Sequence, residues 1–164
     1  MSDPILVSTL DELYAGLASA KGGEVFALAG GNYGRLSLSS KLKFSLDFSA
    51  VTITSANPDD PATFSEVSIH NTSGLTFDGV VFDYTFAPGD PSYKRPFDFS
   101  NSSDITIRNS IFDGDLADDT GTSADGFGYG YALSLGRVSG FVIENNEFYN
   151  FSRGLVVGSS SDLK

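Results

Sequence analysis

The sequence has no cysteine and no tryptophan, a single methionine, a single histidine and few basic residues. The absence of cysteine excludes a disulfide framework and leaves the redox compartment open, so an extracellular protein would rely on its core or on a metal for stability. The 10 basic residues are outnumbered by 21 acidic ones, which gives a formal net charge of −11. Nucleic acids and anionic membranes require clustered Lys and Arg, so we expect neither as a partner.

Long apolar runs are also missing. The N-terminal segment MSDPILVSTLDEL has neither the basic n-region nor the apolar h-region of a Sec signal peptide. No run approaches the length of a transmembrane helix. We expect an extracellular protein, exported by type I secretion through a signal in a region that would follow residue 164.

What is abundant favours β-structure. The chain of 164 residues contains 18 Gly and 14 Phe, and 40% of its residues are hydrophobic. Glycine supports turns and phenylalanine is favoured in strands, so this composition predicts one all-β domain with a sizeable core.

One segment, STLDELYAGLASAKGG, has the pattern of a helix. Ser8 or Thr9 can cap its N-terminus, Glu12 completes a capping box with Thr9, and Gly22 and Gly23 supply the C-terminal stop. An apolar stripe with helical spacing comprises Leu10, Leu13, Tyr14 and Leu17. A single amphipathic helix must bury such a stripe on the rest of the chain.

The remaining sequence repeats one pattern. Apolar-x-apolar triplets begin 30, 36 and 22 residues apart, at Val67, Phe97, Leu133 and Leu155. A second triplet follows eight residues after the first three of these, at Leu75, Ile105 and Phe141, and a phenylalanine follows after fifteen, at Phe82, Phe112 and Phe148. Relative to the 22-residue unit, insertions of 8 and 14 residues both fall after that phenylalanine. Insertions confined to one corner are typical of a solenoid.

A less regular coil precedes these repeats, with apolar triplets that begin at Leu36, Phe44 and Val51. In a coil of three short strands, alternate side chains point inward and stack on those of neighbouring coils. For the stretch ITIRNSIFDG we expect Ile105, Ile107 and either Ile111 or Phe112 to point inward, and Thr106 and Arg108 to face out.

Gly79, Asn109 and Asn145 occupy matching positions between the second and third strands. Glycine and asparagine both tolerate the left-handed conformation of a tight corner. A stacked asparagine side chain can also hydrogen-bond to the backbone of the next coil. The pattern therefore recurs because every coil must pass the same corner.

This organisation resembles the right-handed parallel β-helix of the pectate-lyase-like superfamily. The resemblance is carried by the N-terminal helix, the segment GGEVFALAGGNYGRLSLS and coils such as ITIRNSIFDG and FVIENNEFYNFSRGLVVGSSSDL. More narrowly, the chain resembles β-helix modules of bacterial secreted proteins with Ca²⁺-binding nonapeptide repeats, related to alginate epimerases and polysaccharide lyases. We expect one all-β domain over residues 1–164, with a cap helix region at 1–23 and coils at 24–164.

The resemblance implies that the first triplet of each repeat lies in the sheet that lines a sugar groove. The insertions at residues 84–96 and 114–131 would then border this groove, and loops on a rigid scaffold often carry function. The outward positions of the groove sheet are Ser37, Ser68, Asp98, Ser134 and Val156. Most of these side chains are small and uncharged, so the floor of the expected groove offers few catalytic groups.

The first insertion holds the best candidate for substrate binding. Tyr93, Lys94 and Arg95 stand close to Asp98 in the sequence. An aromatic ring can stack on a pyranose face, and Arg95 can clamp a sugar carboxylate. The alternative is a set of solvated loop residues in which Arg95 forms a local ion pair with an aspartate.

Further candidate substrate-binding residues lie near the second insertion. Tyr129 and Tyr131, in the segment GFGYGY, would form either an aromatic flap over the groove or a Gly-rich hairpin. Arg153 precedes the last groove strand, where it could reach a ligand or pair with Glu147.

The second insertion is also rich in carboxylates, and Ca²⁺ accepts varied oxygen geometry. Ca²⁺ is therefore the one cofactor that the sequence suggests, with the candidate ligands Asp115, Asp118, Asp119 and Asp125. Their spacing does not match an EF-hand, and the alternative is a solvated acidic loop.

His70 lies where the first strand of its coil ends. It could act as a general base, but no acidic or tyrosyl partner is identified near it in the sequence. We therefore interpret it as an ordinary turn residue.

The chain ends with GLVVGSSSDLK, and Leu163 stands where the second strand of a new coil would begin. No capping element follows, so the last coil is expected to expose an apolar cross-section. We expect either an N-terminal fragment of a longer protein or a homo-oligomer that covers this end through Leu155, Val157 and Leu163.

Two classes of function fit these features, and both have a polysaccharide as the partner. In the first, the chain is the N-terminal β-helix portion of a secreted carbohydrate-active protein that acts on acidic polysaccharide as a lyase or C5-epimerase. That chemistry needs a neutralised carboxylate, a base and an acid, and the sequence contains no complete set, so we expect the fragment itself to be inactive. In the second, the chain is a non-catalytic scaffold or glycan-binding module of a secreted adhesin-like protein.

Overall fold

The computed structural model describes residues 3–39 and 47–164, and the triplet predicted at Phe44 lies outside them. The elements are, in chain order, β1 (Ile5–Val7), α1 (Leu10–Ser19), β2 (Val25–Leu28), β3 (Gly31–Asn32), β4 (Arg35–Leu38), β5 (Asp47–Ser55), β6 (Ala62–Phe64), β7 (Glu66–His70), β8 (Ser73–Asp78), β9 (Val81–Asp83), β10 (Phe97–Ser100), β11 (Thr106–Arg108), β12 (Ile111–Asp113), β13 (Tyr131–Gly136), β14 (Val142–Glu144), β15 (Glu147–Tyr149) and β16 (Arg153–Gly158).

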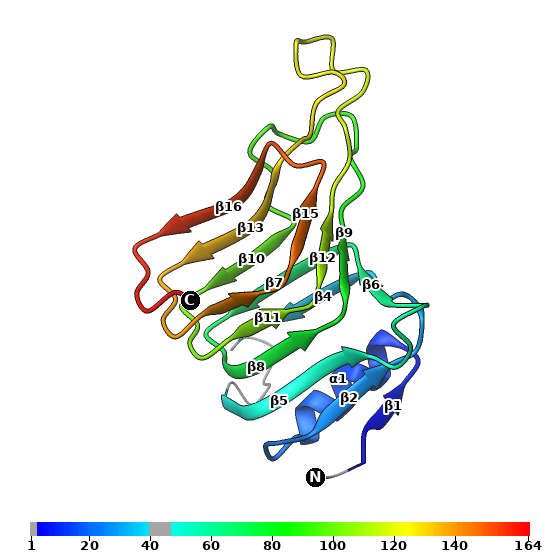
Figure 1. The fold of residues 1–164 in the computed structure, drawn as a ribbon, viewed down its shortest axis with the longest axis vertical. Coiled ribbons are helices and arrows are strands. Elements are labelled where there is room, and N and C mark those ends of the chain that lie inside the picture. Colours follow the sequence, from blue (N-terminus) through cyan, green and yellow to red (C-terminus); the bar gives the residue numbers. More distant parts are fainter. Residues whose placement is uncertain (1–2, 40–46) are drawn as a thin grey trace.

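These strands form three parallel sheets (Figure 1). Sheet A has the order β1-β2-β5-β8-β11-β14, sheet B the order β15-β12-β9-β6-β3, and sheet C the order β16-β13-β10-β7-β4. From β2 onwards, consecutive strands pass from sheet A to B to C and back to A, so each turn of the chain adds one strand to every sheet. The fold is a parallel β-helix, as the sequence predicts.

The strand register confirms the repeat. In sheet C, the successive register partners are Val67, Phe97, Leu133 and Leu155. In sheet B, Phe112 is aligned with both Phe82 and Phe148. Both insertions lie at the corner from sheet B to sheet C, where Figure 1 shows them projecting together from the upper end of the molecule.

The corner from sheet A to sheet B has the predicted backbone conformation. Gly79, Asn109 and Asn145 have φ angles of 66°, 51° and 52°, all in the left-handed region. The predicted side-chain contacts are met only in part. Asn109 donates to the neighbouring coil, but to Asp78 Oδ1 over 2.8 Å and not to its backbone. The contact with backbone comes from Asn146, which donates to the Ile107 carbonyl oxygen over 2.8 Å. The prediction thus located the turn correctly, and only the contact with backbone falls one residue later than expected.

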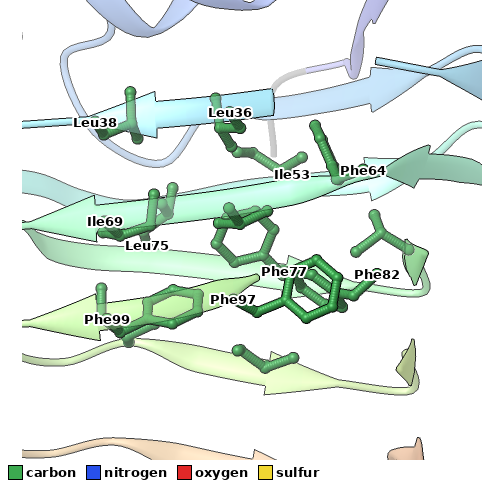
Figure 2. Packing of buried hydrophobic residues seen from close by; sticks show 14 of the residues in the cluster. Leu36, Leu38, Ile53, Phe64, Ile69, Leu75, Phe77, Phe82, Phe97 and Phe99 are labelled. Atoms are coloured by element: carbon green, nitrogen blue, oxygen red, sulfur yellow. The ribbon is translucent and has the colours of Figure 1, made fainter. Parts of the chain in front are cut away.

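The core is a continuous column of apolar side chains inside the coils (Figure 2). Phe112 is fully buried and stacks on Phe82 and Phe148, with ring centroids 4.4 and 4.6 Å apart. Ile111 is 36% exposed, so Phe112 is the inward residue of the pair that the sequence left open.

The N-terminal cap combines the predicted helix with a strand. Thr9 caps α1 and accepts a hydrogen bond from the Glu12 backbone over 3.2 Å, and Leu13 and Leu17 are fully buried. The helix ends at Ser19, before the glycines predicted to stop it. Residues 5–7, which were expected in the helical region, instead pair with β2 as β1. No helix in the described ranges is long and apolar enough to cross a membrane.

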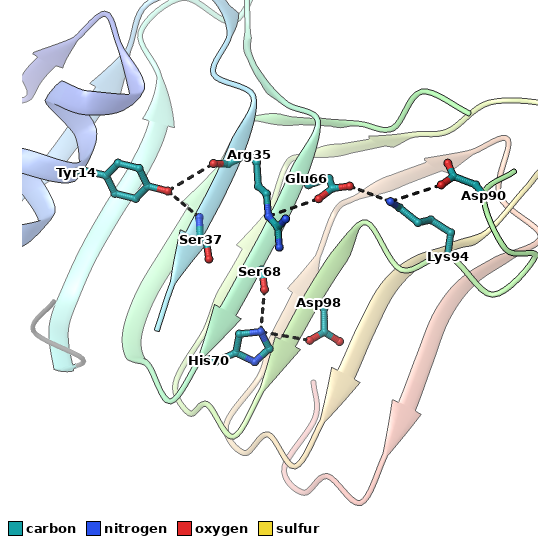
Figure 3. A network of polar contacts seen from close by, with 9 residues as sticks. All are labelled: Tyr14, Arg35, Ser37, Glu66, Ser68, His70, Asp90, Lys94 and Asp98. Atoms are coloured by element: carbon teal, nitrogen blue, oxygen red, sulfur yellow. Dashed lines mark hydrogen bonds and ion pairs between the residues drawn. The ribbon is translucent and has the colours of Figure 1, made fainter. Parts of the chain in front are cut away.

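Tyr14 of α1 covers the edge of sheet C. Its Oη accepts a hydrogen bond of 2.9 Å from the backbone of Ser37 in β4, the edge strand of this sheet (Figure 3). Because an uncovered edge strand is a template for unwanted pairing, this contact protects the N-terminal end of the sheet.

Candidate functional site: the outer face of sheet C

The outer face of sheet C is formed by the side chains that alternate with the core residues of β4, β7, β10, β13 and β16. Its central row consists of Ser37, Ser68, Asp98, Ser134 and Val156, which are successive register partners. The two insertions lead into the N-terminal ends of β10 and β13, so they lie beside this face. The face is less bare than predicted, because three polar groupings flank the row.

The first grouping is an ion-pair network (Figure 3). Lys94 Nζ lies 3.0 Å from Glu66 Oε1 and 3.7 Å from Asp90 Oδ1, and Arg35 Nε lies 3.5 Å from Glu66 Oε2. The hydrogen bond to Glu66 raises the pKa of Lys94. The charge of Lys94 is therefore already neutralised, and its contacts tie the first insertion to β7. A direct substrate contact for Lys94 stays a prediction.

A cavity of about 250 Å³ lies over this network and is lined by Arg35, Ser65, Glu66, Tyr84, Thr85, Ala87, Asp90 and Lys94. Tyr84 is buried and donates a hydrogen bond of 2.8 Å to Asp90 Oδ2. Burial and this hydrogen bond raise the pKa of Tyr84. Tyr129 donates to the Asp90 carbonyl oxygen over 2.9 Å and packs its ring against Phe86, so it joins the two insertions.

Alkaline pH is expected to destabilise this corner. The pKa values of Tyr84 and Lys94 are raised, so the folded chain holds both protons more tightly than the unfolded chain does. This stabilisation is fully present below the unfolded pKa values, about 10, and is lost as the pH rises through the folded values. We expect the free energy of unfolding in urea to fall as the pH rises above about 10, and to fall less steeply in Tyr84→Phe.

The matched control for this prediction is Tyr93→Phe, since Tyr93 is 63% exposed in the same insertion. This variant should keep the alkaline decline of the wild type. An equally steep decline in Tyr84→Phe would contradict the role of the buried hydroxyl.

The second grouping surrounds His70, the last residue of β7. Its Nε2 lies 2.7 Å from Ser68 Oγ and 3.9 Å from Asp98 Oδ2 (Figure 3). Its Nδ1 contacts Ser100 Oγ. The interpretation of His70 as a turn residue without an acidic partner was wrong. The 30-residue register places Asp98 beside Ser68, and Ser100 beside His70.

The third grouping is a column of Arg95, Tyr131 and Arg153 at the N-terminal ends of the sheet C strands, next to the corner where the insertions join, and not in the outward row itself. Tyr131 and Arg153 are register partners, and the guanidinium carbons of Arg95 and Arg153 lie 5.9 and 5.1 Å from the centroid of the Tyr131 ring. Within the described ranges, neither arginine forms an ion pair. The alternative pairing of Arg153 with Glu147 is not found, and Glu147 instead accepts a hydrogen bond from Tyr149. Two unneutralised cations thus flank one aromatic ring.

The carboxylates of the second insertion are dispersed. Asp115 accepts a hydrogen bond of 2.9 Å from the Phe86 backbone, whereas Asp125 accepts one of 2.9 Å from the Thr120 backbone. Hydrogen bonds from Thr120 also lower the pKa of Asp125. Asp118 and Asp119 are exposed. In the part of the chain that the structure describes, no group of three or more His, Cys, Asp or Glu side chains could hold a metal ion. Ca²⁺ binding stays a prediction.

The last coil exposes apolar side chains that are buried in earlier coils. Leu155, Val157 and Leu163 are 45%, 43% and 39% exposed. Leu163 precedes Lys164, whose backbone N–H donates to the Phe141 carbonyl oxygen, so this segment has begun to extend sheet A as predicted. Self-association through these residues stays a prediction.

The fold and this face define a parallel β-helix with a polar, loop-flanked sheet. No family model matches the chain, and no curated protein matches it. Among solved structures, the crystal structure of an alginate lyase from Paenibacillus sp. str. FPU-7 is similar, with a TM-score of 0.44 and 18% sequence identity. The match covers 96% of this chain and 65% of that one. A similarity of this degree assigns no activity, which has to be argued from the side chains of this chain.

Proposed function

We propose that this chain is the β-helix portion of an extracellular carbohydrate-active protein of the pectate-lyase-like type, which binds acidic polysaccharide along sheet C, beginning at the N-terminal ends of its strands. The observation that carries the proposal is the column of Arg95, Tyr131 and Arg153. Its two guanidinium groups make no ion pair with any described residue.

The chemistry of this column suits a polyuronate. Guanidinium groups form bidentate, charge-assisted hydrogen bonds with carboxylates. Arg95 and Arg153 come from coils two strands apart, which corresponds to about 10 Å at the spacing of neighbouring strands. Their guanidinium carbons nevertheless lie 5.9 and 5.1 Å from the centroid of the one Tyr131 ring, so a sugar acid that approaches this ring meets both cations. The net charge of −11 repels anions elsewhere on the chain and makes binding depend on these cations.

The geometry favours binding without turnover for the described chain. Elimination or epimerisation needs a cation that neutralises the sugar carboxylate and a base within reach of the same sugar. Arg95 and His70 are separated by five residues of strand register, about 16 Å of extended chain. We therefore favour a glycan-binding role, with the lyase or epimerase reaction as the second candidate because His70 and Asp98 supply titratable groups beside it.

Isothermal titration calorimetry with oligouronates and with neutral oligosaccharides of equal length tests the proposal. We expect binding of the acidic series only, and the affinity should weaken as salt is added. Equal affinity for both series, or no binding of either, would contradict it. Absorbance of an unsaturated product in the same samples would establish lyase activity instead of simple binding.

A further inference from the structure

We propose that Ser68, His70 and Ser100 form a second carboxylate-binding subsite on sheet C, which accepts an acidic sugar only when His70 carries an extra proton. This inference rests on the proposed function and assigns it a pH dependence. The three side chains lie on β7 and β10, and each is partly exposed on the outer face.

The hydrogen bonds of the ring determine how many donors the subsite offers. Ser68 Oγ lies 2.7 Å from Nε2, and Ser100 Oγ contacts Nδ1. In either neutral tautomer one ring nitrogen is an acceptor, so one serine must direct its hydroxyl proton at the ring. Only the other serine can then donate to a ligand. In the imidazolium both ring nitrogens donate, so both hydroxyl protons are free to bind a carboxylate.

Protonation of His70 also offsets the negative charge of Asp98, which would otherwise repel an acidic sugar. Asp98 Oδ2 lies 3.9 Å from Nε2, too far for a hydrogen bond but close enough for a strong electrostatic interaction. With a neutral ring the cluster carries the negative charge of Asp98, which repels an acidic sugar. With a protonated ring its net charge is zero.

No other charge in the described ranges competes for the ring. On β7 itself, Glu66 is paired with Arg35 of β4 and with Lys94. The remaining outward neighbour on β4 is Ser37, and on β10 it is Asp98. Histidine is also the side chain whose charge ordinarily changes between pH 5 and 8, whereas sugar carboxylates stay ionised throughout that range.

The subsite lies within reach of the same ligand as the arginine column. Asp98 follows Arg95 by three residues, about 10 Å of extended chain. An oligosaccharide of several units can therefore contact both sites. The pH dependence of its affinity would come from the subsite at His70 alone.

Calorimetry with one oligouronate at about pH 5.5 and about pH 8 tests the subsite. We expect the wild-type affinity to be roughly three to ten times higher at the lower pH, as for one partly exposed charge and one hydrogen bond. His70→Gln, which cannot take up the proton, should bind equally at both pH values. Asp98→Asn should bind more tightly than the wild type at the higher pH because the repulsive carboxylate is gone.

Ser37→Ala is the matched control, since it removes a hydroxyl from the same row of the face without touching the ring. It should retain the full pH dependence. Undiminished pH dependence in His70→Gln, or equal wild-type binding at both pH values, would overturn the subsite and leave the proposed function standing. Absence of binding at either pH would overturn both.

Discussion

Phe112→Ala is expected to lower the free energy of unfolding by about 3–5 kcal/mol, the range for removing a buried phenylalanine from a well-packed core. The Phe112 ring is fully buried between those of Phe82 and Phe148, with interplanar angles of 6° and 3°. It also meets the edge of Phe97 at 5.7 Å. The cavity left by the substitution would interrupt the stack that connects three coils.

Ile111→Ala is the matched control for this prediction. Ile111 precedes Phe112 in β12 but is 36% exposed, so its truncation should cost about 1 kcal/mol or less. Urea denaturation monitored by circular dichroism gives both values. Equal losses for the two variants would contradict the assignment of inward and outward residues, and with it the packing of the whole repeat.

The double substitution Arg95→Gln and Arg153→Gln is expected to weaken oligouronate binding roughly 10- to 100-fold. A hydrogen bond to a charged group contributes about 1.5–3 kcal/mol. Both arginines are exposed and their charges are screened by solvent, so the combined effect is expected to lie below the sum of two such bonds. Glutamine retains a donor and much of the side-chain length but removes the charge. Calorimetry should show the loss mainly at low salt, where the charges are least screened.

Arg108→Gln serves as the control for the charge removed. Arg108 lies on sheet A, where its NH2 group is 2.9 Å from Asp78 Oδ2, so it is neither free nor on the binding face. Its replacement should leave the affinity unchanged. If Arg108→Gln weakens binding as much as the substitutions on sheet C do, the ligand is held by the overall field of the chain and the proposed site is wrong.

The repeat could be predicted from the sequence because the apolar residues that form the core recur at fixed spacings. Val67 and Phe97 are aligned in sheet C at the spacing that the sequence shows, and the left-handed corner at Asn109 follows from residue type. The inward choice between Ile111 and Phe112 was not decidable, since both are apolar and adjacent. Phe112 points inward because its ring stacks on Phe82 and Phe148 of the neighbouring coils, and a contact between coils is not visible in the sequence of one coil.

The candidate site was predicted less well. Tyr93, Lys94 and Arg95 are adjacent in the sequence, yet the structure leaves Tyr93 exposed and turns Lys94 to Glu66 of the preceding coil. Arg95 lies instead beside Tyr131, which comes from the second insertion. The insertions lack a repeat, so nothing in their sequence fixes which side chains meet.

The histidine cluster shows that one signal was overlooked. Once the 30-residue offset is known, Asp98 must lie beside Ser68 and Ser100 beside His70. Proximity along the sequence was the wrong criterion, because in a β-helix the neighbours of a residue lie one coil away. The central outward row already placed Ser68 beside Asp98, and the next outward row, two residues further on, places His70 beside Ser100.

Mapping of backbone amide chemical shifts during titration with an oligouronate tests the central claim most directly, namely that sheet C is the face that binds. We expect the largest changes at Arg95, Asp98, Tyr131 and Arg153, with small changes at Thr76 and Thr106 on the outer side of sheet A. Changes centred on sheet A or sheet B, or an unchanged spectrum at saturating ligand, would contradict the account.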